Sequence, residues 1–71
     1  MIVGPVIVEG VYGTIVYDWT CENRKLTIYD YDDDTAIYIK VWGPDFDTQR
    51  EEGDLSPKMT KKKLLEWLEH G

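Results

Sequence analysis

The sequence has one cysteine, Cys21, and one histidine, His70, among 71 residues. A single cysteine excludes a disulfide within the chain, and a lone thiol is typical of a reducing compartment, so we expect a cytoplasmic protein. The N-terminal apolar stretch, residues 2–8, has no basic segment before it and is too short for a signal sequence or a membrane span. We therefore expect no membrane association.

Motifs that carry catalysis or cofactor binding are also missing. The chain has no glycine-rich phosphate loop, no metal-ligand spacing and no nucleophile elbow, and its only histidine is next to last. The stretch Asp30–Asp34 (DYDDD) has carboxylates at the first three ligand positions of a calcium loop. However, Thr35 stands where that loop needs glycine, and Val41 stands where it needs a bidentate glutamate. We expect a protein that is not an enzyme and that binds no metal or cofactor.

Basic residues are few, and their distribution is uneven. The net charge is −6, and residues 1–57 carry twelve acidic side chains against four basic ones, whereas residues 58–71 carry four lysines against two glutamates. The acidic body would repel nucleic-acid phosphates, so we expect no direct nucleic-acid binding. It would attract a basic protein surface and speed the encounter with it. The alternative is that the charge only keeps a small protein soluble.

Hydrophobic residues make up 42% of the chain, which is ordinary for a folded protein. A chain of 71 residues forms one small domain that buries about 60% of the surface exposed by its unfolded form. The composition therefore predicts a single folded domain, residues 1–71.

Alternating apolar residues predict four β-strands between residues 2 and 42. Three polar turns separate them: Glu9-Gly10, residues 20–23 and Asp33-Asp34. Pro5 lacks an amide proton and places the first strand at a sheet edge. Asp-Asp is not a favourable pair for a tight turn, so a longer third loop is the alternative.

The turn positions predict one set of strand registers. The predicted pairs are Ile2 with Tyr17, Ile15 with Ile28, Tyr17 with Leu26, Ile28 with Ile39, and Tyr29 with Tyr38. The predicted inner face consists of Ile2, Val6, Val8, Val11, Ile15, Tyr17, Leu26, Ile28, Ile37, Ile39 and Val41. Because these registers sort the apolar residues to one side, we expect an antiparallel meander.

The C-terminal third predicts a loop followed by a helix. Residues 43–56 begin with Gly-Pro, are rich in acids and have only Phe46 and Leu55 as apolar anchors, which is typical of an acidic loop. Ser56 as a cap and Pro57 at the first position predict a helix over residues 57–70, with Thr60 as the rival cap. Leu64, Trp67 and Leu68 form its apolar stripe.

Together these elements predict an α+β fold, a four-stranded antiparallel β-meander with one C-terminal α-helix packed on one face. A small, partly open barrel plus the helix is the alternative. The same registers place an aromatic surface on the outer face of the sheet, where polar residues would be usual. Its residues are Tyr12, Tyr29, Tyr31, Tyr38 and Trp42.

Two surfaces are therefore candidates for partner binding, the aromatic outer face and a set of acidic residues. The acidic set consists of Asp32, Asp33, Asp34, Asp45, Asp47, Glu51, Glu52 and Asp54. We expect a non-catalytic inhibitor whose carboxylates mimic nucleic acid and occupy a basic site on a nucleic-acid-binding protein. Its composition is similar to that of small acidic proteins of viruses and mobile genetic elements. The alternative is a homo-oligomeric module, such as a homodimer, that associates through the aromatic outer face.

Overall fold

The computed structural model describes residues 1–31, 33–46 and 48–70, and it contains five strands and one α-helix. The strands are β1 (Val3–Glu9), β2 (Ile15–Cys21), β3 (Arg24–Asp30), β4 (Ala36–Trp42) and β5 (Gln49–Asp54). The helix is α1 (Lys61–His70), and two short 3-10 turns are η1 (Val11–Gly13) and η2 (Pro44–Phe46). The predicted α+β class is confirmed, with five strands in place of four.

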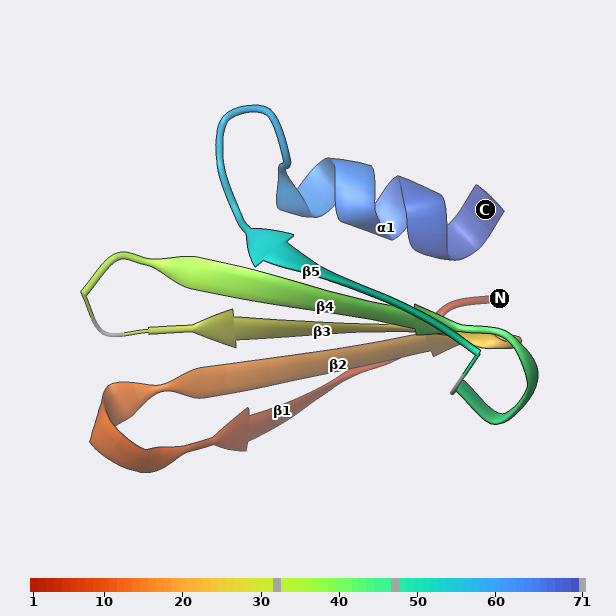
Figure 1. The fold of residues 1–71 in the computed structure, drawn as a ribbon. Coiled ribbons are helices and arrows are strands. Elements are labelled where there is room, and N and C mark those ends of the chain that lie inside the picture. Colours follow the sequence, from red (N-terminus) through yellow and green to blue (C-terminus); the bar gives the residue numbers. More distant parts are fainter. Residues whose placement is uncertain (32, 47, 71) are drawn as a thin grey trace.

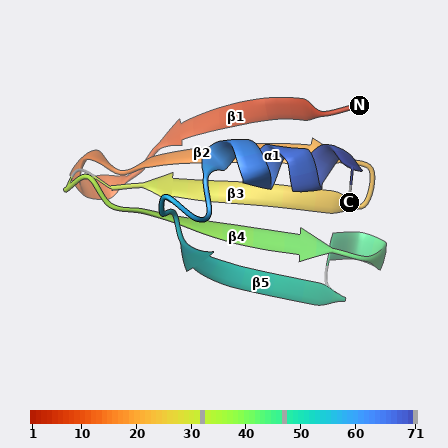
Figure 2. The same cartoon turned by 90° about the horizontal axis from the view of Figure 1, so that it is seen from above.

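The strands form one antiparallel meander in the order β1-β2-β3-β4-β5 (Figure 1). In the described residues β1 and β5 are the two edges of an open sheet, so the barrel alternative is wrong. The helix lies above one face, where it contacts β2 and β3 (Figure 2). The molecule therefore has two layers, and the opposite face of the sheet has no covering element in the described part of the chain (Figure 1).

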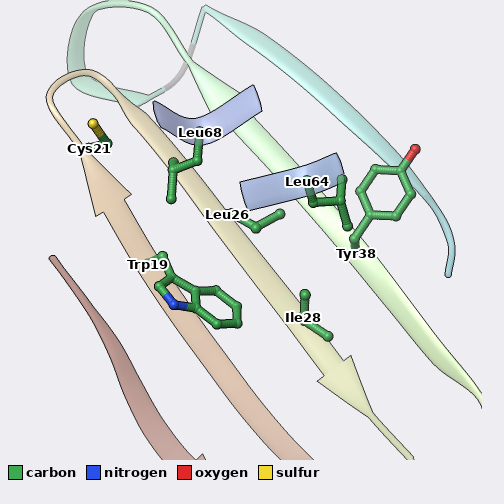
Figure 3. Close-up of a cluster of buried hydrophobic side chains, with 7 residues drawn as sticks. All are labelled: Trp19, Cys21, Leu26, Ile28, Tyr38, Leu64 and Leu68. Carbon is green, nitrogen blue, oxygen red and sulfur yellow. The ribbon is translucent and has the colours of Figure 1, made fainter. Parts of the chain in front are cut away.

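The core lies between α1 and the middle of the sheet. Leu64 and Leu68 of α1 are fully buried against fully buried Leu26 of β3 (Figure 3). The rest of the cluster consists of Trp19, Cys21, Ile28 and Tyr38. The predicted stripe of the helix is confirmed, because Trp67 also packs against this cluster. Among the described residues, no helix combines the length and the apolar composition needed to cross a membrane.

The helix begins at Lys61, four residues later than the sequence predicts. The Thr60 hydroxyl accepts a hydrogen bond from the Lys63 amide (3.2 Å), which makes Thr60 the cap. Ser56 instead closes a separate turn, because its hydroxyl accepts hydrogen bonds from the amides of Lys58 and Met59. The rival cap is therefore the one used.

The predicted acidic loop, residues 43–56, contains a fifth strand, so a loop throughout this segment is wrong. β5 pairs with β4 in a register that places Gly53 opposite Tyr38 and Glu51 opposite Lys40. Its sequence, QREEGD, has no apolar residue to signal a strand. Polar contacts hold it instead, since the Tyr38 hydroxyl donates a hydrogen bond to Glu51 (2.8 Å).

The register of the first hairpin differs from the predicted one. Glu9 pairs with Ile15, and residues 10–14 form the connection, so Val11 and Tyr12 lie in η1 and not in a strand. A shift by an odd number of residues exchanges the two faces of a strand. Val6 and Val8 therefore lie on the face away from α1, whereas the prediction put them beneath the helix.

A similar shift occurs between β3 and β4. Residues 31–35 separate the two strands in the sequence, and the Tyr31 amide donates a hydrogen bond to the Thr35 carbonyl (2.9 Å). Ile28 consequently pairs with Tyr38, and Tyr29 pairs with Ile37. The alternative of a third loop longer than Asp33-Asp34 is therefore the correct one. Three residues predicted to face the core lie on the opposite side: Ile37, Ile39 and Val41.

The second hairpin keeps its predicted faces although its loop is shorter. Only Glu22 and Asn23 connect β2 to β3, and Tyr17 pairs with Ile28 where the prediction paired it with Leu26. The displacement is an even number of residues, so Tyr17, Leu26 and Ile28 stay on the helix side as predicted, and Trp19 joins them in the core.

Gly53 provides a test of this register. A Cβ atom there would lie 2.9 Å from the Tyr38 ring and hydroxyl, and the ring cannot withdraw because Tyr38 is buried and bonded to Glu51. We expect Gly53→Ala to lower the free energy of unfolding by about 1–3 kcal/mol, measured by urea denaturation.

Gly10→Ala is the matched control for this substitution. Its added Cβ would meet nothing closer than 3.5 Å, and Gly10 has an ordinary φ of −96°. We expect little change there. Equal urea midpoints for both variants would contradict the close packing of Tyr38 on β5.

Candidate protein-interaction site

Five exposed carboxylates gather at one end of the sheet, where the β1–β2 turn, the β3–β4 turn and the end of β5 lie (Figure 1). Glu9 and Asp30 both pair with Ile15, from the two strands that flank β2. Asp54 pairs with Ile37, the second residue of β4. Asp33 and Asp34 lie in the turn between β3 and β4. We call Glu9, Asp30, Asp33, Asp34 and Asp54 the acidic end.

The turn between β3 and β4 is held by Asp33. Its carboxylate accepts hydrogen bonds from the Thr35 hydroxyl and from the Thr35 amide. These bonds, the hydroxyl first, hold the pKa of Asp33 below its usual value, so it is ionised at neutral pH. Asp34 follows with a φ of 66°, a left-handed conformation that aspartate and asparagine tolerate better than most residues.

The acidic residues predicted from the sequence do not form one surface. Asp33, Asp34 and Asp54 belong to the acidic end, whereas Asp45 lies in η2 at the opposite end of the sheet (Figure 1). Glu51 and Glu52 are successive residues of β5, and their side chains point to opposite faces. Asp32 and Asp47 lie outside the described residues.

Glu51 belongs to a polar cluster between β4, β5 and the helix. Its carboxylate accepts the Tyr38 hydroxyl at 2.8 Å and lies 3.5 Å from the Lys40 ammonium. The Tyr38 hydrogen bond lowers the pKa of Glu51, with Lys40 acting in the same direction, and the same bond raises the pKa of Tyr38. Lys40 also lies over the Trp67 ring at 4.8 Å. Glu51 is thus part of the framework.

The ion pairs of the protein lie away from the acidic end. Over the described ranges they are Asp18 with Lys25, Glu51 with Lys40, and Glu52 with Arg50. None of them includes a carboxylate of the acidic end. The charge of the acidic end is therefore not neutralised by a basic side chain of this part of the chain.

The five aromatic residues predicted for one outer face lie in three places. Tyr38 is 5% exposed in the core, and Trp42 packs edge-on against Trp67 of α1 with ring centroids 5.5 Å apart. Both lie on the helix side because of the shifted β3–β4 register. Tyr29 remains on the uncovered face. Tyr12 and Tyr31 lie in the turns beside the acidic end, with Tyr12 93% exposed.

One hollow of about 290 Å³ lies at the β1–β2 turn, lined by Glu9, Gly10, Gly13, Thr14 and Ile15. It is open, and it lies at the lower limit of the volumes usual for small-molecule sites. In residues 1–31, 33–46 and 48–70, no three His, Cys, Asp or Glu side chains are grouped so that they could hold a metal ion. The acidic end therefore presents separate carboxylates and not a chelating set.

Comparison of the chain with protein-family models, with curated proteins and with solved structures finds no match.

Sequence reasoning missed Glu9 and Asp30 as members of the acidic end. Both are the last residues of their strands. Only the register places them in one row with Ile15 between them. The sequence signal was a carboxylate at the end of each of the two strands. The incorrect register predicted for the first hairpin did not bring these two carboxylates into one row.

The Tyr38–Glu51 hydrogen bond predicts a pH-dependent stability. Because the folded-state pKa of Glu51 is lowered from 4.5, its contribution is fully present above the unfolded-state pKa and is lost as pH falls through the folded-state pKa. We expect Glu51→Gln to lower the urea midpoint at about pH 6 and to converge with the parent protein near pH 3. Glu66→Gln, on the exposed side of α1, is the control. A Glu51→Gln deficit that stays constant over this pH range would contradict the assignment.

Proposed function

We propose that this chain is a non-catalytic protein-binding protein whose acidic end occupies a basic site on a partner. The observation that carries the proposal is the gathering of Glu9, Asp30, Asp33, Asp34 and Asp54 at one end of the sheet, apart from the three ion pairs of the described residues. Carboxylates without an internal counter-ion remain available to the lysines and arginines of another protein.

The shape of the acidic end suits a site that binds a phosphate backbone. Neighbouring strands lie about 4.8 Å apart, so the five strand positions from β1 to β5 span roughly 19 Å. Negative charges spread over that width resemble successive phosphates more than a compact chelating group. The partner that fits is therefore a nucleic-acid-binding protein. Occupation of its nucleic-acid site by the acidic end would inhibit that protein.

Two tyrosines add apolar contact area to this charge. Tyr12 in η1 and Tyr31 at the start of the β3–β4 turn are both exposed at the same end. Tyrosines are enriched among the residues that carry binding energy, because they combine a rigid ring with a hydroxyl. Exposed ion pairs each contribute only about 0–1 kcal/mol, so these rings supply affinity that charge alone does not.

Long-range attraction is the second contribution of the acidic end. The chain carries a net charge of −6, which favours encounter with a basic surface and predicts binding that weakens as salt is added. Binding through Glu51 or Glu52 is disfavoured, since each already has an internal partner.

The test is a pair of double variants with equal charge change at opposite ends of the sheet. Asp33→Asn with Asp34→Asn removes two charges from the acidic end and keeps the side-chain oxygens that the turn uses. Glu22→Gln with Asp45→Asn removes two charges from the turns at the other end. We expect the first pair to weaken partner capture from a lysate about tenfold at low salt, and the second pair to leave it nearly unchanged.

Bound proteins are identified by mass spectrometry at low and at high salt. A basic, nucleic-acid-binding protein that is retained only at low salt agrees with the proposal. An equal loss of capture in both double variants would mean that only net charge matters. No loss in either would exclude the acidic end as the binding site.

A further inference from the structure

The uncovered face of the sheet is mostly apolar in the row nearest the acidic end and mixed in the other two rows. Reading across the sheet from β1, the first cross-strand row consists of Val8, Val16, Tyr29, Ile37 and Asp54. The next row consists of Val6, Asp18, Thr27, Ile39 and Glu52. The last consists of Val3, Thr20, Lys25, Val41 and Arg50. We call these three rows the open face.

Aliphatic side chains are exposed on the β1 side of this face. Val3, Val6 and Val8 are 60%, 60% and 52% exposed. Contiguous apolar surface of this kind marks an interaction site.

The charges of the open face are balanced, unlike those of the whole protein. Asp18 lies 4.0 Å from Lys25, and Arg50 lies 2.9 Å from Glu52. That leaves Asp54, at one end of β5, as the only open-face charge outside these pairs among the described residues. A strongly basic partner finds no matching charge here, whereas a surface equal to itself, apolar and balanced, does match.

We propose that the open face packs against the open face of a second copy of this chain, related by a two-fold axis that runs across the strands. This axis reverses the order of the rows, so that each end of one sheet covers the opposite end of the other. Asp54 of one copy then faces Arg50 of the second copy, and Tyr29 faces Lys25. Both contacts are favourable, the second as a cation–π pair. The middle row faces its own copy, so Asp18 and Glu52 each lie opposite the same residue and keep Lys25 and Arg50 of their own chain as counter-ions.

The other simple two-fold, parallel to the strands, is disfavoured by the acidic end. It would place the acidic ends of both copies side by side, and their like charges would repel. It would also leave Asp54 opposite Val8. With the axis across the strands, the two acidic ends instead point in opposite directions. The dimer would then present both of them to partners.

The area of the open face suits a small and weak dimer. Three rows about 6.6 Å apart on five strands about 4.8 Å apart give a face of roughly 475 Å² in plan. Two copies would bury about 950 Å², which is close to the roughly 1,000 Å² expected of a specific interface. The interface is at the small end of the range, so we expect a dimer in the micromolar range that dissociates on dilution.

The first test uses two neighbouring residues of β1 with similar exposure and opposite faces. Val8 is 52% exposed on the open face, and Ile7 is 58% exposed on the other face, where it pairs with Tyr17. Val8→Glu should raise the dissociation constant at least tenfold in sedimentation equilibrium, and Ile7→Glu should leave it within about threefold of the parent value. Circular dichroism checks that both variants fold.

The second test exchanges the charges at the two ends of β5. Asp54→Arg brings two arginines together across the interface, and Arg50→Asp brings two aspartates together, so each single change should weaken the dimer about tenfold. The double variant restores opposite charges and should recover the parent dissociation constant. Recovery of the dissociation constant is expected only with the axis across the strands. With the axis parallel to the strands, the double variant would not recover it.

A parent protein that stays monomeric at millimolar concentration would overturn the proposal. So would equal effects of Val8→Glu and Ile7→Glu, and failure of the double charge variant would overturn the axis. The dimer does not depend on the acidic end, because Asp33→Asn with Asp34→Asn should leave the dissociation constant unchanged. Loss of partner capture and loss of dimerisation are therefore separate results.

Discussion

Docking of Leu64 and Leu68 onto Leu26 is the interaction on which the rest of the structure depends. All three side chains are fully buried, and each contributes about 1.5–3 kcal/mol, a sum comparable with the whole stability of a small domain. The helix has ten residues, too few to form stably alone. Without this contact neither the helix nor the covered face of the sheet would persist. Arg24 supports the far end, because its guanidinium donates to the Leu68 carbonyl at 2.8 Å.

One short helix covers only part of one face of a five-stranded sheet, and this limit shapes the remaining surface. α1 contacts β2 and β3, so β1 keeps its aliphatic side chains exposed, and the open-face aliphatics of β2 and β4 are only half-buried. The turns that shift the registers also bring acidic residues to one end. The dimer and the acidic end are consistent with each other, since the proposed axis keeps the two acidic ends apart and leaves both accessible.

The sequence was sufficient for the features that depend on local pattern. The apolar stripe of Leu64, Trp67 and Leu68 predicted the helix, and the alternation of Tyr17, Leu26 and Ile28 placed β2 and β3 correctly beneath it. Register depended on loop length, which sequence specifies weakly. The longer connections at residues 10–14 and 31–35 reversed the faces of β1 and β4.

The candidate site was predictable only in part, for the same reason. Asp33, Asp34 and Asp54 were recognisable by charge, but their alignment with Glu9 and Asp30 depends on correct pairing. The one-residue shift in β4 is the reason that Tyr38 and Trp42 lie on the helix side and not on the predicted outer face. β5 has no apolar residue that could signal a strand in the sequence. It is held by Tyr38 of the neighbouring strand, which packs over Gly53 and donates a hydrogen bond to Glu51.

The most direct measurement is the solvent accessibility of isoleucine methyl groups by paramagnetic relaxation, at low and high protein concentration. We expect Ile28 to be protected at both concentrations, and Ile37 and Ile39 to be accessible in dilute protein and protected in concentrated protein. Equal accessibility of Ile39 at both concentrations, or an accessible Ile28, would contradict it.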